Sequence, residues 1–198
     1  YLHASAARQR LFLDRFPDER YRKERREIRI NKGATDNLIC PYVDLPDDYG
    51  TYLQTCVSAN TRQKIRRFAR RIDGSGDLRI TEATPDTLAR DLDILMSLWT
   101  RKWRATTGER TDERASKYRR ILEAFGAIDA LHVPVIWEKD VPLGALASFV
   151  DRRKAALYFF IGSRDESRAE PFIGWALHAH SIRWAIERGL RAYDFCHG

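Results

Sequence analysis

The sequence has few cysteines, no long apolar run and no initiating methionine. Its three cysteines, Cys40, Cys56 and Cys196, are odd in number and lack the paired spacing of zinc sites. We therefore expect no disulfide, no structural zinc and a reducing compartment, the cytoplasm. The densest apolar stretch, AALYFFIG, is far shorter than the about 20 residues that a membrane-spanning helix needs. The N-terminus, YLHASAARQR, has no apolar signal core, and without a methionine we expect the chain to be a piece of a larger protein.

Several enzyme motifs are also missing. The chain has no GxxxxGK phosphate loop, no GxGxxG after a strand and no GxSxG elbow, so nucleotide hydrolysis, dinucleotide redox chemistry and α/β-hydrolase chemistry have no support. His178 and His180 lie two residues apart in a predicted helix, where their side chains project about 200° from each other. They cannot hold one ion together, and we expect no catalytic metal.

What is present indicates a globular, basic domain. The 198 residues include 43% apolar and 11% aromatic side chains, enough for one domain with its own core. The 35 basic and 28 acidic side chains leave a net charge of +7. This excess suits an anionic partner such as a phosphate, a nucleotide or an acidic glycan, without choosing among them.

The first part of the chain gives no clear secondary-structure pattern, whereas the remainder does. Residues 1–50 mix charges with few periodic apolar positions, and we interpret them as the remnant of a preceding unit followed by a linker. Residues 51–198 are predicted to form the main domain, beginning with a helical segment that breaks at 58–60. Its second part is a basic amphipathic helix, with six cations around an apolar face of Ile65, Phe68, Ala69 and Ile72.

The periodicity that follows predicts an α+β fold. Its elements, in order, are a strand at 78–83, a helix from Thr84, a helix from about Ser116, three antiparallel strands within 131–162, a helix at 174–188 and a strand at 190–195. Pro134 predicts a bulge or unpaired position in the first of the three strands. The closing helix has one apolar stripe containing Trp175 and a second containing Leu177 and Trp184, so we expect it to be covered on both sides.

The element order and the final segment together resemble a known family. GWALHAHSIRWAIERGLRAYDFCHG is similar to the glycine-started helix, second glycine and Tyr-Asp-Phe strand of the GNAT acyltransferase superfamily, and more closely of its CelD-like branch, related to the FemAB transferases. Residues 40–198 share this resemblance. It implies a mixed, mostly antiparallel central sheet flanked by helices. It also implies a further helix and two strands after Gly198, so we expect an open sheet edge and a C-terminally incomplete domain.

Two features depart from the family's pattern. Ile173 precedes Gly174 where proline is usual, and SRAEPFIG holds one glycine instead of the spaced glycines of a phosphate loop. The acidic residues Asp165, Glu166 and Glu170 crowd the same loop and would oppose an anion. These departures weaken the prediction of an acetyl-CoA site in particular.

The resemblance implies a donor site for acyl-CoA. The pyrophosphate would lie near Gly174 and Trp175 at the start of the closing helix, with Arg168 adding charge. Phe160, Ile161 and Gly162 would line the thioester slot. The alternatives are that Gly174 only allows a tight strand-to-helix turn and that residues 160–162 belong to an ordinary core strand.

Asp194, next to Tyr193 and His197, is the candidate general base, although it could instead cap a turn or pair with an arginine. The resemblance implies acyl transfer from acyl-CoA, such as acetyl-CoA, to an amine or hydroxyl of a metabolite or a cell-envelope or exopolysaccharide precursor. Two alternatives stay open. One is a FemAB-like transferase that uses aminoacyl-tRNA, held by the basic helix, although nothing in the chain resembles an RNA-recognition motif. The other is a non-catalytic half that scaffolds a second half packed on the closing helix.

Overall fold

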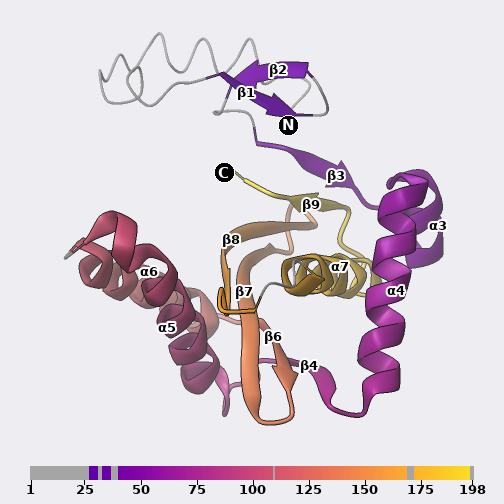
Figure 1. Ribbon diagram of the computed structural model, residues 1–198. Coiled ribbons are helices and arrows are strands. Elements are labelled where there is room, and N and C mark those ends of the chain that lie inside the picture. Colours follow the sequence, from indigo (N-terminus) through magenta and orange to yellow (C-terminus); the bar gives the residue numbers. More distant parts are fainter. Residues whose placement is uncertain (1–26, 31–32, 37–39, 109, 169–171, 197–198) are drawn as a thin grey trace, which may run out of the picture. The chain divides into compact units, whose positions relative to one another are not determined.

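The computed structural model describes residues 27–30, 33–36, 40–108, 110–168 and 172–196 (Figure 1). The chain divides into two compact units, one of residues 42–195 and one of residues 1–41 with 196–198. In the smaller unit, β1 (Glu27–Ile30) pairs antiparallel with β2 (Gly33–Asp36). The assignment of residues 1–50 to a preceding unit and linker stays a prediction.

The larger unit is built on a seven-stranded sheet, in the order β3-β9-β8-β7-β6-β4 with β5 beside β7. Its strands are β3 (Tyr42–Asp44), β4 (Leu78–Glu82), β5 (Leu131–His132), β6 (Pro134–Glu138), β7 (Val141–Asp151), β8 (Ala156–Arg164) and β9 (Ala192–Asp194). Among these described strands, β8 and β9 form the only parallel pair. The predicted α+β architecture, with its meander of β6, β7 and β8, is confirmed. The first predicted strand is interrupted at Val133, which separates β5 from β6, whereas Pro134 itself is the first residue of β6, in register with Glu82.

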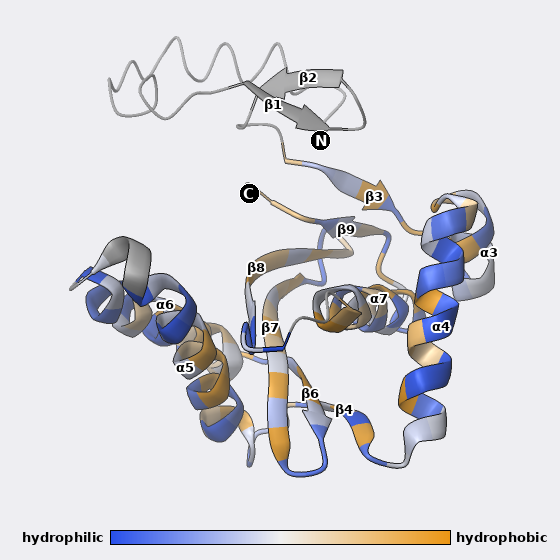
Figure 2. Ribbon diagram, in the orientation of Figure 1, coloured by the Kyte–Doolittle hydropathy of each residue, from blue (hydrophilic) through white to orange (hydrophobic). Residues whose placement is uncertain are grey.

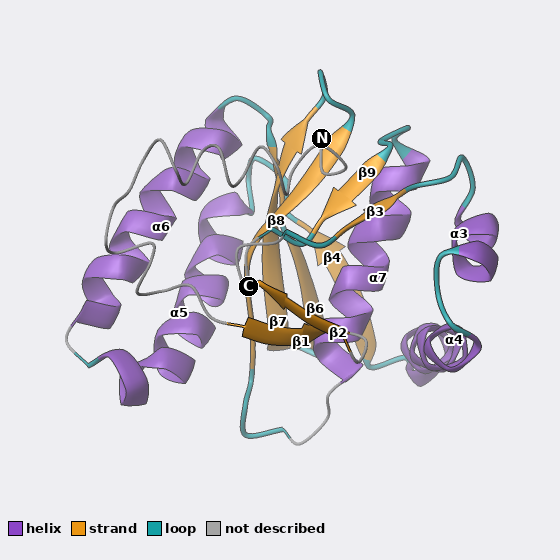
Figure 3. Ribbon diagram, turned by 90° about the horizontal axis from the view of Figure 1, so that it is seen from above, coloured by secondary structure: helices purple, strands orange, loops and turns teal. Residues whose placement is uncertain are grey.

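Helices cover both faces of this sheet (Figure 3). They are α3 (Tyr49–Thr55), α4 (Ala59–Ser75), α5 (Leu88–Thr107), α6 (Arg110–Ala127) and α7 (Phe172–Glu187). The pair α5 and α6 packs on one face and α7 on the other, with α3 and α4 outside α7. Blue, hydrophilic residues dominate α4 in Figure 2, as its basic sequence predicts.

The predicted helix boundaries are partly correct. The break between α3 and α4 is confirmed, because Ser58 caps α4 by accepting a hydrogen bond from the Thr61 backbone N–H at 3.3 Å. Helix α5 begins at Leu88, later than the predicted Thr84, since Thr84 and Thr87 close a turn first. Helix α6 begins at Arg110 instead of near Ser116. Gly108, with φ of 59°, lets the chain reverse directly after α5.

Helix α7 lies between the sheet and α4, as its two apolar stripes predicted. Leu177 is 2% exposed in a cluster with Phe68 of α4, so the second stripe is covered within this chain. Trp175 was expected to pack on the sheet, but its side chain is 45% exposed. It lies about two helical turns before Ile182 on the same side of the helix.

The outer edge of β9 was predicted to be open, and this prediction is wrong. Strand β3 pairs with β9 antiparallel, with Tyr42 opposite Asp194 and Asp44 opposite Ala192. The partner strand thus comes from upstream of the helices. Sequence patterns could not show this, because a three-residue strand has no measurable periodicity.

Candidate active site

The sheet parts between β8 and β9. Only the first three residues of β8, Ala156 to Tyr158, pair with β9. Residues 159–164 continue β8, but within the described part of the chain no strand pairs with them on that side. Backbone groups along this edge are therefore available to a ligand that lies between the two strands.

A β-bulge lies on β8 where this opening begins. Ala147 of β7 is opposite Ile161, and the next residue, Ser148, is opposite Phe159, so Phe160 is the extra residue. A bulge re-aims the local backbone and is common next to active sites. Phe160 is one of the residues that the sequence assigned to the thioester slot.

The side chains of the predicted slot residues pack into the core. The ring of Phe160 lies 5.4 Å from that of Tyr118 and 4.8 Å from that of Phe149, measured between centroids. Ile161 is 6% exposed in the cluster beneath α5. A Cβ on Gly162 would lie 3.3 Å from the Phe159 ring, so this glycine permits close packing. Any contact of this segment with a ligand is therefore made by its backbone.

Two acidic side chains of the loop between β8 and α7, Asp165 and Glu166, are held in hydrogen bonds or ion pairs. Glu166 lies 3.3 Å from the Arg164 guanidinium and 3.4 Å from the Lys102 ammonium. Burial raises the pKa of Glu166, but these two cations outweigh it, so that the pKa lies below its usual value. Hydrogen bonds from Ser167 likewise lower the pKa of Asp165. The predicted repulsion of an anion by these two carboxylates is thus reduced, and Glu170 lies outside the described residues.

The predicted phosphate-binding residues are in different situations. Arg168 pairs with Glu138 of β6 at 2.6 Å. Gly174 is the third residue of α7 instead of its first, and a Cβ there would meet no described atom within 4 Å. Its φ is not positive, so no left-handed turn requires a glycine at this position. Trp175 follows it with an exposed ring.

Asp194 is the last residue of β9, and its side chain is half-buried. It is in register with Tyr42 of β3 and Tyr158 of β8, so the three side chains share the sheet face that α5 and α6 cover further along. Tyr193, the preceding residue, is fully buried on the opposite face. His197, expected beside Asp194, lies outside the described residues.

The structure adds a functional candidate that sequence reasoning missed. His178 Nδ1 lies 2.8 Å from the Tyr193 hydroxyl, and the rings of Phe159 and Phe195 surround the imidazole. Burial lowers the pKa of His178 to about 4, so the ring is neutral at pH 7. No local signal could have found this pair, because it depends on how α7 packs over β9.

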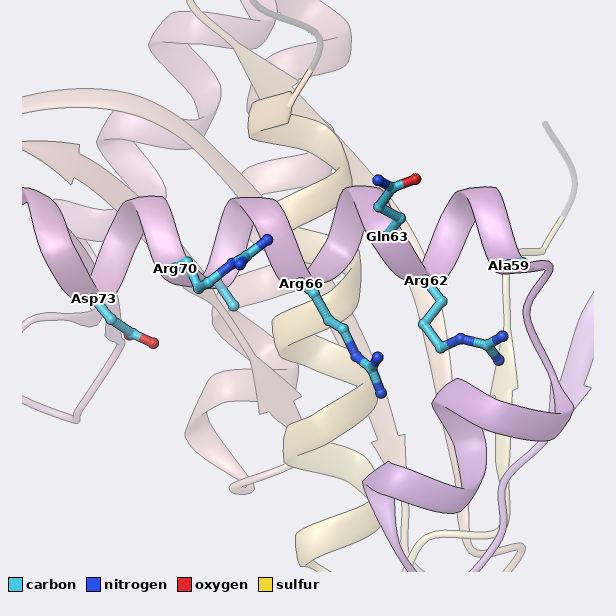
Figure 4. A pocket seen from close by; sticks show the side chains of 7 residues that line it. Ala59, Arg62, Gln63, Arg66, Arg70 and Asp73 are labelled. Carbon is cyan, nitrogen blue, oxygen red and sulfur yellow. The ribbon is translucent and has the colours of Figure 1, made fainter.

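Arginines line one side of α4 (Figure 4), of which Arg62 is half-buried and Arg66 and Arg70 are exposed. Arg62, Arg66 and Arg70 border a shallow groove of about 520 Å³, and Figure 4 shows their side chains along the helix. Arg62 donates hydrogen bonds to the Leu53 and Gln54 carbonyls, which ties α4 to α3. Arg66 and Arg70 take part in none of the ion pairs between described residues. Ala69, predicted on the apolar face, is exposed beside them.

The two histidines of α7 contact different partners. His178 contacts Tyr193, whereas His180 Nε2 lies 3.2 Å from a carboxylate oxygen of Glu82. No group of three or more metal-ligating side chains occurs among the residues that the structure describes. No helix in the described part of the chain has both the length and the apolar character to cross a membrane.

Known protein families and solved structures resemble this chain. The family profile "Acetyltransferase (GNAT) domain" matches residues 59–198. A conserved protein of unknown function from Bacteroides thetaiotaomicron superposes with a TM-score of 0.53 at 18% identity, over 92% of this chain and 57% of that one. FemX gives 0.56 at 10% identity, over 90% and 58%. The C-terminal DUF2156 domain of an Agrobacterium fabrum protein gives 0.53 at 12% identity, over 90% and 50%.

These likenesses show the fold. The chain spans little more than half the length of those three structures, between 50% and 58%. No curated protein sequence matches it.

Proposed function

Because the chain belongs to the acetyltransferase (GNAT) domain family, whose fold supports acyl transfer in general, we propose that it is an acyl-CoA-dependent N- or O-acyltransferase. The observation that carries this proposal is the bulge at Phe160, next to the stretch of β8 that β9 does not pair. The acceptor is an amine or hydroxyl of a metabolite or of a cell-envelope or exopolysaccharide precursor. The CelD-like assignment and a cytoplasmic location belong to the same proposal.

Backbone groups of β8 hold the reacting thioester. A backbone N–H near the bulge donates to the thioester carbonyl oxygen and stabilises the negative charge that develops there. The acceptor's nitrogen or oxygen forms a bond to the carbonyl carbon, the carbon–sulfur bond breaks, and coenzyme A leaves as its thiolate, with the electron pair of that bond on sulfur. Asp194 takes the proton that the acceptor loses. The half-buried position of Asp194 at the end of β9, beside the opening, supports this role.

The donor's pyrophosphate lies by the first turn of α7, near Gly174. The free backbone N–H groups of a helix start favour an anion, and the open space at Gly174 leaves room for one. Positive charge at this loop comes from Lys102 and Arg164, which both pair with Glu166, and from Arg168, which pairs with Glu138. Trp175 offers an exposed ring for the pantetheine or adenine portion.

A thermal melt with acetyl-CoA tests this site. At about 100 times its dissociation constant, a bound ligand adds about 2.7 kcal/mol, which raises the melting temperature by roughly 5 to 10 °C in a domain of this size. Gly174→Trp should abolish this shift. Gly74→Trp is the matched control, because Gly74 is also helical and a Cβ there also meets no described atom.

Two outcomes would contradict the proposal. If acetyl-CoA shifts the melting temperature of neither the unmodified chain nor a longer chain extended beyond Gly198, it is not the donor. If the shift persists in Gly174→Trp, the donor binds elsewhere.

The basic face of α4 favours one second candidate, a FemAB-like transferase that takes its acyl group from aminoacyl-tRNA. Arg66 and Arg70 are exposed, and neither takes part in an ion pair with a described residue. Neutralised phosphates release counterions, so tRNA binding by this helix would weaken steeply with salt. Salt-dependent tRNA binding that Arg66→Ala and Arg70→Ala reduce would support this candidate over the first. The non-catalytic half is less favoured, since α4 already covers the Leu177 stripe.

A further inference from the structure

A groove lies where α6 ends beside β7 and β8. Its volume is about 440 Å³, and its lining includes Phe125, Ile128, Phe149, Arg153 and Tyr158. The lining is mainly apolar. The groove is at the opposite end of β8 from the loop that leads into α7, and is therefore separate from the proposed pyrophosphate position.

A row of register partners connects this groove to the candidate base. Phe149 of β7 is opposite Tyr158 of β8, and Tyr158 is opposite Asp194 of β9. Residues in register on neighbouring strands point to the same face of a sheet, and the strands are about 4.8 Å apart. Asp194 therefore lies one strand from the groove wall at Tyr158.

Aromatic contacts lead from the groove to the bulge. The Phe125 and Phe149 ring centroids are 4.2 Å apart, and those of Phe149 and Phe160 are 4.8 Å apart. At the mouth of the groove, Ile128 is 68% and Phe125 is 36% exposed. Large apolar side chains that meet water beside a groove indicate a surface that a ligand covers.

Among the charged residues that the structure describes at the rim, which include Asp151, only Arg153 takes part in no ion pair. Arg152 pairs with Asp129 at 2.6 Å, and Lys154 lies 3.9 Å from Asp151. Arg153 is exposed in the groove lining and takes part in no ion pair with a described residue. Its guanidinium can hold one anionic group of a ligand.

We propose that this groove binds the acyl acceptor, and that the acceptor is an amphiphile with an apolar body and one anionic group. The body lies on Phe125, Ile128 and Phe149, the anion contacts Arg153, and the nucleophile reaches past Tyr158 towards Asp194. The role of the groove as an acceptor site rests on the proposed acyl transfer. The binding of an anionic amphiphile in the groove is independent of that proposed function.

A matched pair of fluorescent probes tests the groove. 1-Anilinonaphthalene-8-sulfonate has an aromatic body with one sulfonate, and N-phenyl-1-naphthylamine has the same body without the charge. Arg153→Ala should weaken the sulfonate probe about threefold to fivefold and leave the neutral probe unchanged. Ile128→Ser should weaken both about fivefold. Val141→Ser, which changes another exposed apolar side chain away from the groove, should affect neither.

Coenzyme A separates this proposal from the donor site. Because the two ligands occupy opposite ends of β8, saturating coenzyme A should not displace the sulfonate probe. Displacement would overturn the acceptor assignment, and so would equal loss of both probes in Arg153→Ala or unchanged binding in Ile128→Ser. Binding of coenzyme A itself is read from the melt, so failure of the donor site is seen independently. Both substituted side chains are exposed, and a melt of each variant confirms that it remains folded.

Discussion

At the scale of single residues, the sheet places different chemistry on its two faces at β9. Tyr193 is buried on the α7 side, with its hydroxyl 2.8 Å from His178, whereas Asp194 faces the other side with Tyr158. Burial keeps the pKa of His178 at about 4, and the imidazole is therefore uncharged at pH 7. A neutral imidazole and a carboxylate thus lie on opposite sides of one strand, next to the opening between β8 and β9.

Replacing the candidate base tests its role directly. Asp194→Asn should lower kcat/KM for acyl transfer by about 100-fold to 10,000-fold, because the acceptor must lose a proton as it attacks. Binding of acetyl-CoA, read as the melting shift, should not change, since the amide has the same shape as the carboxylate. Steady-state kinetics against pH provide the measurement. Full activity in the variant across pH 6–9 would remove Asp194 from the mechanism.

At the scale of elements, α7 is held between the sheet and α4. Leu177 contributes to this arrangement because its 2% exposed side chain packs in the cluster that includes Phe68 of α4 and Phe172. Leu177→Ala should therefore lower the free energy of unfolding by about 2–5 kcal/mol, through lost burial and the cavity left behind. Urea denaturation followed by circular dichroism measures this value.

Trp175→Ala is the matched control on the same helix. Trp175 is 45% exposed, so its truncation should change the free energy of unfolding by at most about 0.5 kcal/mol. A large loss in this variant, or none in Leu177→Ala, would contradict the packing of α7 described above.

At the scale of the whole molecule, stability should fall in acid. Burial lowers the pKa of His132 to about 3 and that of His178 to about 4, against an ordinary value of 6.5. In the folded state both rings are neutral at pH 5, whereas the unfolded chain takes up protons there. Stability is thus fully present above pH 6.5 and is lost as the pH falls towards 4. Each ring contributes up to about 1.4 kcal/mol per pH unit in this window.

Urea melts at several values between pH 7.5 and 4.5 measure this slope. In His132→Asn the slope should become smaller, because one buried imidazole is gone while the side chain can still bond to Ser181. The remaining slope comes from His178 and His180, whose pKa burial also lowers. Stability that stays constant over this range would contradict the burial of both rings.

The sequence by itself determined the order and type of the elements from α3 onwards. Helices α4 and α7 follow from apolar positions that recur every three or four residues, and β7 and β8 from dense apolar runs between turns. These signals are local, so they survive without any knowledge of tertiary contacts. The sequence also indicated Phe160, Gly174 and Asp194 as site candidates, because the chain resembles a known family.

Only the tertiary structure decided which groups meet. The bulge at Phe160 depends on the register between β7 and β8, and the pairing of β3 with β9 joins residues about 150 positions apart in the chain. The His178–Tyr193 contact and the row from Phe149 to Asp194 exist only once helices and strands from distant segments pack together. Periodicity shows which face of an element is apolar. Which neighbour covers that face is determined by packing across the whole unit.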